Sequence, residues 1–185
     1  RMKSTITDDY GPKIIKHINK YKAFCNVPDH VNYQETIHNC YNLYFPFEHE
    51  AEEAEGWENI RGFLTHIFGN QEITWRHPKY KTSVKVNELD LGLDYIQLLY
   101  QQPAQILPIL CLVSRENNTG KSTLGKFFRY LFGQNVAVVG NADLANDFNA
   151  FWAPKLLVIC DETRIDKLAV VEKIKNLSTA DKIWM

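Results

Sequence analysis

The fold of this chain is decided by one stretch, ILPILCLV at residues 106–113 followed by SRENNTGKST at residues 114–123. The first eight residues form a continuous apolar run, which predicts a strand buried on both faces. Pro108 has no N–H to donate and confines ladder pairing to the second half of that strand. The following loop is polar and opens a helix, so the stretch predicts a strand, a loop and a helix in succession.

The residues after this loop continue the same alternation. One amphipathic helix is predicted after the loop and ends at Gly133, and its apolar face consists of Leu124, Phe127, Phe128, Leu131 and Phe132. Residues 136–139 predict a second strand and residues 156–160 a third. Strands that alternate with helices are typical of a parallel sheet with crossover helices. We therefore expect an α/β core over residues 104–185.

The residues before this core differ in texture. Residues 1–50 are polar and rich in aromatics. They predict a linker arm with one short helix around residues 14–18, followed by irregular chain that packs against another part of the protein. Residues 51–103 are predicted to be mainly helical, because two apolar stripes recur at helical spacing. The stripes consist of Ile60, Phe63, Leu64, Ile67 and Phe68, and of Leu91, Tyr95, Leu98 and Leu99.

A short basic and aromatic segment, WRHPKYK at residues 75–81, lies between the two stripes. Cationic and aromatic side chains together are typical of surfaces that stack the bases and pair the phosphates of single-stranded nucleic acid. Seven residues also fit a solvent-exposed polar turn, which is the simpler interpretation.

The composition is that of an ordinary globular protein. The 185 residues contain 21 Lys and Arg and 22 Asp and Glu, so the formal charge of −1 provides no whole-chain attraction for nucleic acid or membranes. No apolar run approaches the roughly 18 residues of a membrane-spanning helix, and the N-terminus does not resemble a signal peptide. We expect a cytoplasmic protein with no membrane partner. Zinc-ligand residue types occur at Cys25, His30, His38 and Cys40, but their spacing matches no familiar zinc motif.

The polar loop predicts a phosphate-binding site. Its candidate nucleotide contacts are Asn118, Thr119, Gly120, Lys121, Ser122 and Thr123. Gly120 lets backbone N–H groups approach a phosphate, Lys121 can reach the β and γ oxygens, and Ser122 is placed to hold Mg²⁺. The helix that begins here adds the positive end of its dipole. Arg115 stands where the usual pattern has its first glycine.

Two carboxylates, Asp161 and Glu162, follow the third predicted strand. At a strand end beside a phosphate loop, Asp161 would order Mg²⁺ through its water shell and Glu162 would polarise the attacking water. A surface strand that merely ends in two acids is the alternative. Glu162 favours hydrolysis of ATP over transfer to a metabolite, and the guanine-reading Asn-Lys-x-Asp of GTPases is absent from the sequence. Lys121 and Glu162 are therefore the candidate catalytic residues.

Four segments together resemble the ATPases of helicase superfamily 3, and more specifically the phage and plasmid primase-helicases related to the poxvirus-type primase-helicases. They are residues 118–122, residues 140–153, Asp161-Glu162 and residues 175–183. The resemblance covers residues 95–185, and residues 22–47 are similar to the linker that precedes the ATPase in such proteins.

The resemblance implies a P-loop NTPase core of the AAA+ type, in which hydrolysis of ATP with Mg²⁺ drives a DNA translocase at the replication forks of a phage or mobile element. It also implies single-stranded or forked DNA as a partner, a hexamer of the full-length protein, a fused or associated primase, and the cytoplasm of a bacterial or phage-infected cell. Lys175 best matches the basic position of the family's DNA-contacting element, and Lys182 is a weaker match.

Two departures from the family pattern are Arg115 and the end of the sequence at Met185, before the family's sensor Asn and trans-acting arginine finger. Such a finger contributes about 10³ to 10⁵ in turnover. We therefore expect a truncated core with exposed sheet edges that binds nucleotide weakly and is no motor by itself. A nucleotide-binding replication scaffold that unwinds no strand is the alternative function. A small-molecule kinase is a third, for which the sequence suggests no acceptor pocket.

Overall fold

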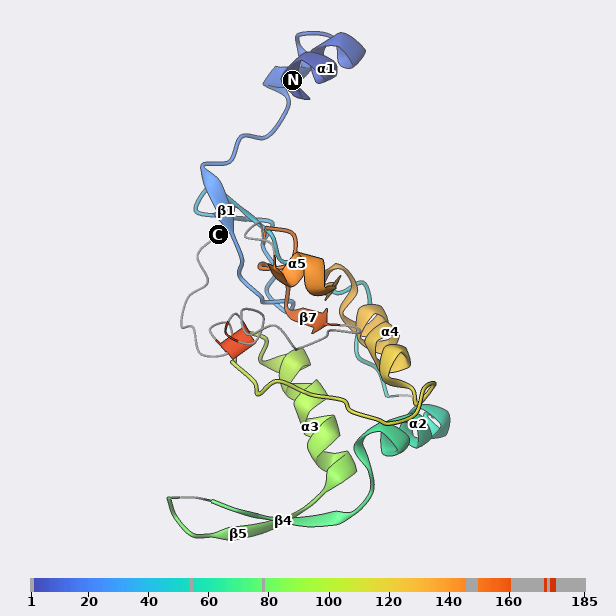
Figure 1. The fold of residues 1–185 in the computed structure, drawn as a ribbon. Helices are drawn as coiled ribbons and strands as arrows, with labels where there is room; N and C mark the ends of the chain where they lie inside the picture. The colour runs from blue at the N-terminus through green and yellow to red at the C-terminus, as the bar shows by residue number, and fades with distance from the viewer. Residues whose placement is uncertain are drawn as a thin grey trace. The chain divides into compact units, whose positions relative to one another are not determined.

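The computed structural model describes residues 2–53, 55–77, 79–145, 150–160, 172, 174 and 175 (Figure 1). The chain divides into two compact units. The first contains residues 1–27 and 34–43, and the second contains residues 28–33 and 44–185. Among the described residues, no helix is both long enough and apolar enough to cross a membrane.

The first unit contains a three-stranded sheet. Its elements are the helix α1 (Met2–Tyr10), the 3₁₀ turn η1 (Ile14–Lys16), and the strands β1 (Ala23–Cys25), β2 (Thr36–Ile37) and β3 (Cys40–Asn42). The strand order is β1-β3-β2, with β1 parallel and β2 antiparallel to β3. The buried Asn42 amide braces the sheet, because its Oδ1 accepts from the Val27 N–H at 3.0 Å and its Nδ2 donates to the Val27 carbonyl at 3.2 Å.

The prediction of a short helix around residues 14–18 is wrong in the type and the length of the element. Only the single turn η1 forms there, and the α-helix lies before it, where Gly11 with φ +82 follows the last helical residue. The packing predicted for the aromatic arm is confirmed at Phe47, in the second unit. Its ring centroid lies 4.9 Å from that of Tyr100 and 5.8 Å from that of Phe132. The buried Asn135 amide fixes the same segment through two hydrogen bonds with the backbone of Phe45, at 3.0 and 2.7 Å.

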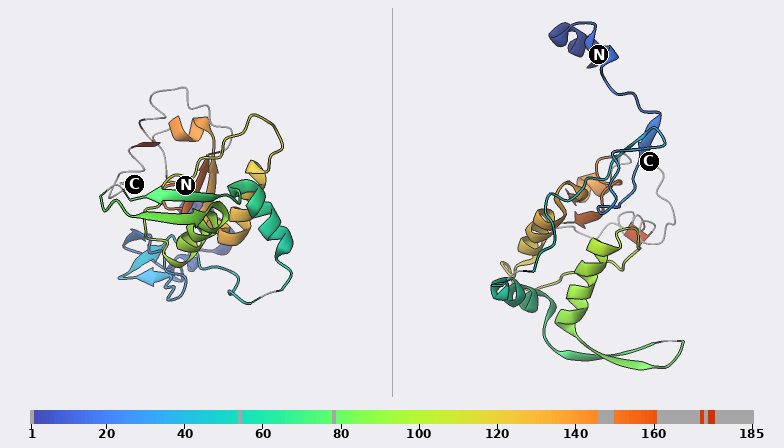
Figure 2. Two further views of the ribbon diagram at one scale, coloured as in Figure 1. Left: turned by 90° about the horizontal axis from the view of Figure 1, so that it is seen from below. Right: turned by 180° about the vertical axis from the view of Figure 1, so that it is seen from behind.

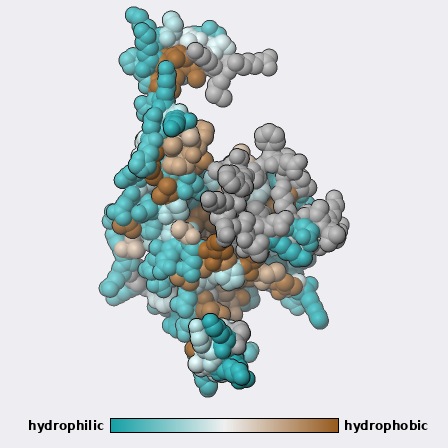
Figure 3. All heavy atoms as spheres, turned by 90° about the vertical axis from the view of Figure 1, so that its left-hand side faces the viewer, coloured by the Kyte–Doolittle hydropathy of each residue, from teal (hydrophilic) through white to brown (hydrophobic). Residues whose placement is uncertain are grey.

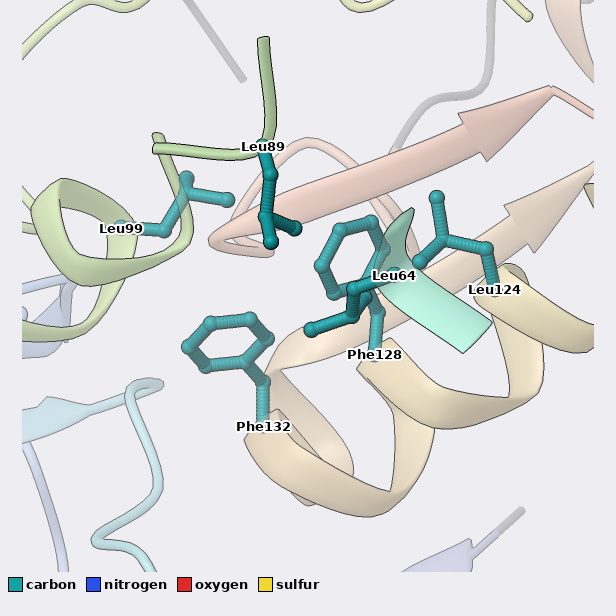
Figure 4. Packing of buried hydrophobic residues seen from close by; sticks show 6 residues of the cluster. All are labelled: Leu64, Leu89, Leu99, Leu124, Phe128 and Phe132. Carbon is teal, nitrogen blue, oxygen red and sulfur yellow. The ribbon is translucent and has the colours of Figure 1, made fainter. Parts of the chain in front are cut away.

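Three helices form the core of the second unit. They are α2 (Glu58–Phe68), α3 (Glu88–Gln101) and α4 (Lys121–Phe132). The buried cluster contains Leu64 from α2, Leu89 and Leu99 from α3, and Leu124, Phe128 and Phe132 from α4 (Figure 4). Most residues of the predicted apolar stripes pack in this cluster, but Ile60 and Leu91 are exposed, and Leu98 is half-buried outside the cluster. Leu91 follows Leu89 by two residues, about 200° around the helix, and so faces away from the core.

The segment between α2 and α3 is a β-hairpin, where the sequence analysis expected mainly helix. β4 (Glu72–Arg76) pairs antiparallel with β5 (Ser83–Asn87). Figure 2 shows this hairpin as a separate two-stranded ribbon that continues from the ends of the two helices. Of the polar turn predicted at residues 75–81, residues 77 and 79–81 do lie between the strands, whereas Trp75 and Arg76 belong to β4. Ile73 and Trp75 alternate with polar neighbours, a period-two signal that favours a strand.

The second and third predicted strands are confirmed as a parallel pair. β6 (Val136–Val139) follows the turn η2 (Gly133–Asn135), and the helix α5 (Asn141–Ala145) lies between β6 and β7 (Leu157–Cys160) in the chain. One face of the pair packs on the helix cluster through Val136, Leu157 and Ile159, and the other contributes to a second cluster that consists of Ala137, Val139, Leu144 and Trp152. Side chains therefore cover both faces, as in layered α/β proteins.

The first predicted strand is not formed. Residues 106–113 join no ladder: Leu107 and Leu112 contact the helix cluster, whereas Val113 is 86% exposed. Pro108 lacks an N–H, and its carbonyl accepts from the Tyr95 hydroxyl at 3.1 Å. A strand needs a neighbour along one edge, and no described strand pairs with this segment. The described residues form a mixed α/β structure with small sheets, and the wider parallel-sheet P-loop core stays a prediction.

Candidate functional site

Residues 114–120 form a loop that leads directly into α4, and the predicted phosphate contacts, Asn118 to Thr123, lie at the end of this loop and in the first turn of the helix. Gly120 is the N-cap residue of the helix with φ +88, and Asn118 also has a positive φ of 58. Backbone turns of this kind aim N–H groups to one side and form nests for anions. Because Gly120 has no side chain to cap the helix, the N–H groups of the first turn stay available to a ligand.

The Lys121 side chain bends back across this loop. Its ammonium donates to Ser114 Oγ and to Thr119 Oγ1, the second at 2.9 Å. The two hydroxyl oxygens lie 3.0 Å apart, and Ser114 Oγ donates to the Glu116 carbonyl at 2.7 Å. Within the described ranges, no carboxylate pairs with Lys121. Neutral hydroxyls therefore hold this cation, and an anionic ligand would compete with them effectively.

One side of the loop rests on α2. A Cβ at Gly120 would lie 3.1 Å from Ile67 Cδ1 and 3.2 Å from Phe63 Cε2. His66 Nε2 lies 3.2 Å from the Thr119 carbonyl oxygen, so the ring donates to the loop when Nε2 carries its proton. The apolar residues of α2 were predicted as core, and His66 was not among the predicted site residues. No local pattern identifies this histidine, because its contact depends on how α2 packs beside α4.

The remaining predicted nucleotide contacts lie at the same helix end. Ser122 and Thr123 are exposed in the first turn of α4, and Asn118 is exposed in the loop. Hydroxyl and phosphate oxygens are ligands that suit Mg²⁺. The structure thus leaves Ser122 accessible to a metal ion that is bound to phosphates, while the metal itself stays a prediction.

The predicted acidic residues follow β7, whose end lies beside α4. A Cβ added at Gly125 would lie 3.7 Å from both Cδ1 and Cγ2 of Ile159. Gly125 comes one helical turn, about 6 Å, after Lys121. The carboxyl end of β7 is therefore close to the first turns of α4. Asp161 and Glu162 themselves lie outside the described residues.

This loop and strand fall within a segment similar to other proteins. Residues 112–185 match DUF5906, a family of unknown function. Comparison of the chain with curated proteins and with solved structures found no match. The DUF5906 segment begins two residues before Ser114 and contains α4, β6 and β7, whereas α2 and the β4–β5 hairpin precede it. The family match therefore includes the predicted site and leaves its activity open.

Two further features of the DUF5906 segment bear on the predicted site. Lys175 is exposed and pairs with Glu172 Oε1 at 3.2 Å, an arrangement that contributes about 0–1 kcal/mol and that a phosphate could replace. Lys182 lies outside the described residues, so both predicted DNA contacts stay predictions. Cys160, at the end of β7, is exposed, but neighbouring protein atoms desolvate its thiolate in part and raise the pKa of the thiol.

A zinc centre has no support in the described part of the chain. It contains no group of three or more His, Cys, Asp or Glu side chains that could hold a metal ion. Cys25, His30, His38 and Cys40 are all among the residues searched.

Proposed function

We propose that residues 114–123 bind the phosphates of ATP together with Mg²⁺, and that the chain is the ATP-hydrolysing motor domain of a DNA replication primase-helicase of a phage or mobile element. The position of the Lys121 ammonium is the observation that supports phosphate binding. It lies over a loop with two positive-φ residues and at the start of a helix that no N-cap side chain closes.

Nucleotide binding would draw Lys121 away from the hydroxyls of Ser114 and Thr119. A cation about 4 Å from a phosphate charge gains on the order of 4 kcal/mol at an effective dielectric near 20. The first-turn N–H groups of α4 and the positive end of the helix dipole act on the same phosphates. Because the hydroxyl contacts are neutral, leaving them costs little compared with this attraction.

We assign the hydrolysis of bound ATP to residues of α4 and to the two acids that follow β7 in the sequence. In this proposal Ser122 and Asp161 hold Mg²⁺, and Glu162 orients and deprotonates the attacking water. The packing of Ile159 against Gly125 supports the pairing of these groups, because it brings the end of β7 to the helix that carries Lys121.

The step from an ATPase to a DNA motor rests on the resemblance to the superfamily 3 helicases. It makes single-stranded or forked DNA the partner, with Lys175 and Lys182 as contacts. It also assigns a hexamer to the full-length protein, with a fused or associated primase in the cytoplasm of a bacterial or phage-infected cell.

Calorimetric titration with Mg·ATP tests the nucleotide site. We expect Lys121→Ala to weaken binding at least tenfold, which is about 1.4 kcal/mol or roughly a third of the gross attraction given above. Lys126→Ala is the matched control, since it removes an exposed lysine from the same helix five residues later. Equal affinities of the two variants and of the unaltered chain would contradict the site.

A second measurement separates a motor from a scaffold. The ATPase rate of the full-length protein is measured with and without single-stranded DNA, beside Glu162→Gln. A motor shows a rate that DNA increases and that Glu162→Gln abolishes while Mg·ATP binding persists. A rate that DNA leaves unchanged would favour a scaffold that uses ATP only to assemble.

A further inference from the structure

The tip of the β4–β5 hairpin carries a row of aromatic rings. Trp75 is 50% exposed and Tyr80 is 67% exposed. His77 lies between them, with its ring centroid 5.2 Å from that of Trp75 and 4.6 Å from that of Tyr80. Every residue of β4 falls in the exposed class, although neighbouring atoms cover about half of Trp75 and more of Ile73. A two-stranded hairpin is at best marginally stable alone, which favours a role for a ligand or partner.

His77 also organises the turn. Its Nδ1 accepts hydrogen bonds from the backbone N–H groups of Lys79 and Tyr80, each at 3.1 Å. The backbone N–H of His77 donates to the Thr82 carbonyl at 2.8 Å, and the backbone carbonyl of His77 accepts from the Lys81 N–H at 3.0 Å. These four bonds connect residues 77 and 79–82 in the absence of a ligand, which lowers the conformational entropy that these residues lose on binding.

The same tip is cationic. The hairpin, residues 72–87, contains four Lys and Arg side chains and one carboxylate, in a chain whose formal charge is −1. The carboxylate, Glu72, pairs with Lys85 at 2.7 Å. Over the described ranges no carboxylate pairs with Arg76, Lys79 or Lys81. Figure 3 shows the hairpin at the bottom of the view, where its surface is mainly hydrophilic.

We infer that this tip binds single-stranded nucleic acid, with bases stacked on Trp75 and Tyr80 and phosphates paired with three cations, Arg76, Lys79 and Lys81. Bases offer flat faces to exposed rings, and their backbone supplies anions for cations that no carboxylate pairs. The Lys79 ammonium lies 5.4 Å from the Tyr80 ring centroid, and in this proposal it moves from that ring to a phosphate when a base stacks there. Trp, Tyr and Arg are also enriched in protein interfaces, but lysine is depleted there, so Lys79 and Lys81 favour nucleic acid over a protein partner. The inference rests on the proposed function, because a DNA motor needs a surface that binds DNA. Its test does not depend on the Lys121 site, because binding is measured without ATP.

Fluorescence anisotropy with labelled oligothymidine and the 185-residue chain, without nucleotide, tests this inference. Trp75→Ala/Tyr80→Ala should weaken binding about 25-fold or more, because each stacked base contributes about fivefold or more and the two contributions multiply. Trp75→Phe alone, which keeps a ring, should retain most of the affinity. Exchange of the three cations for Gln should also weaken binding and reduce the slope of log K against log salt by about 2.

A charge-matched variant is the control. Lys13, Lys16 and Lys20 are three exposed cations outside the hairpin, and their exchange for Gln alters the net charge equally. We expect this triple variant to bind oligothymidine within about twofold of the unaltered chain, because it removes no paired phosphate. Equal losses in the two triple variants would overturn the inference, since they would indicate attraction by overall charge alone.

The remaining outcomes are equally decisive. Retention of binding by the aromatic double variant, or no binding of oligothymidine by the unaltered chain, would overturn the inference and leave the hairpin to a protein partner. Tighter binding of duplex DNA would overturn it too, because stacked base pairs cannot reach the rings. Oligouridine in place of oligothymidine distinguishes RNA from DNA as the natural strand. Since ATP is absent, failure here would leave the Lys121 site untouched, and failure at Lys121 would leave this result standing.

Discussion

Helix α2 is held to α3 by a contact that leaves no room for a methyl group. Gly92 is buried in α3, and a Cβ there would lie 2.7 Å from Cδ1 of Phe68 and still closer to Cγ and Cδ2. Cγ attaches the ring, so rotation of the ring about its own axis cannot relieve the overlap. Gly92→Ala must therefore expel the Phe68 side chain or separate the helices. Because α2 also forms the wall of the 114–120 loop, this contact supports the candidate site.

The size of the effect follows from two opposing contributions. Burial of a phenylalanine side chain stabilises by about 1.5–3 kcal/mol, and overpacking of a core costs about 1–3 kcal/mol. The opposing contribution is helix propensity, because alanine in place of a glycine inside a helix stabilises the folded state by up to about 1 kcal/mol. We expect Gly92→Ala to lower the free energy of unfolding by about 1–2 kcal/mol, which lowers Tm by about 2–8 °C for a chain of this size.

Gly62→Ala is the matched control. Gly62 lies inside α2 with no atom within 4 Å of an added Cβ, so alanine there should stabilise by up to about 1 kcal/mol. Urea unfolding followed by circular dichroism measures both variants. A double-mutant cycle then isolates the contact: in a Phe68→Ala background, Gly92→Ala should be neutral or stabilising. Equal destabilisation by Gly92→Ala in both backgrounds would refute this reasoning.

Two more predictions concern the candidate site. Gly120→Ala places a residue with a Cβ in a left-handed conformation, and that Cβ lies within 3.2 Å of Ile67 and Phe63. We therefore expect the free energy of unfolding to fall by about 1–2 kcal/mol and Mg·ATP to bind more weakly. Unchanged stability in urea would contradict this prediction. Only the thiolate reacts with iodoacetamide, and the pKa of the Cys160 thiol is raised. The alkylation rate of Cys160 should therefore reach half its maximum at a higher pH than the rate of free N-acetylcysteine. Mass spectrometry of the labelled peptide measures this rate, and a midpoint at or below that of the reference thiol would count against the desolvated environment.

Much of the candidate site could be predicted from local pattern. The apolar stripe of α4, its end at Gly133, and the strands β6 and β7 all lie where the sequence placed them. Each of these features depends on backbone periodicity or on a glycine conformation, which a few neighbouring residues decide. The Gly120-Lys121 junction was predictable for the same reason, since a loop that opens an amphipathic helix is visible in eight or nine consecutive residues.

Other elements depended on partners that a linear pattern does not specify. Residues 106–113 have the composition of a buried strand, yet no described strand pairs with them, because a ladder needs a neighbour as well as an apolar run. The hairpin was hidden between two helical stripes, although the alternation around Trp75 carried its signal.

The sequence by itself determined where the loop before α4, that helix and the strands β6 and β7 lie in the chain, because these follow from interactions between residues close in the chain. Only the tertiary structure decided that α2 forms one wall of that loop, with His66 beside the Thr119 carbonyl. It also decided that the end of β7 reaches the first turns of α4. Both contacts join residues that are distant in the chain, and they form because packing of the three helices and the parallel strand pair around shared apolar side chains brings those residues together.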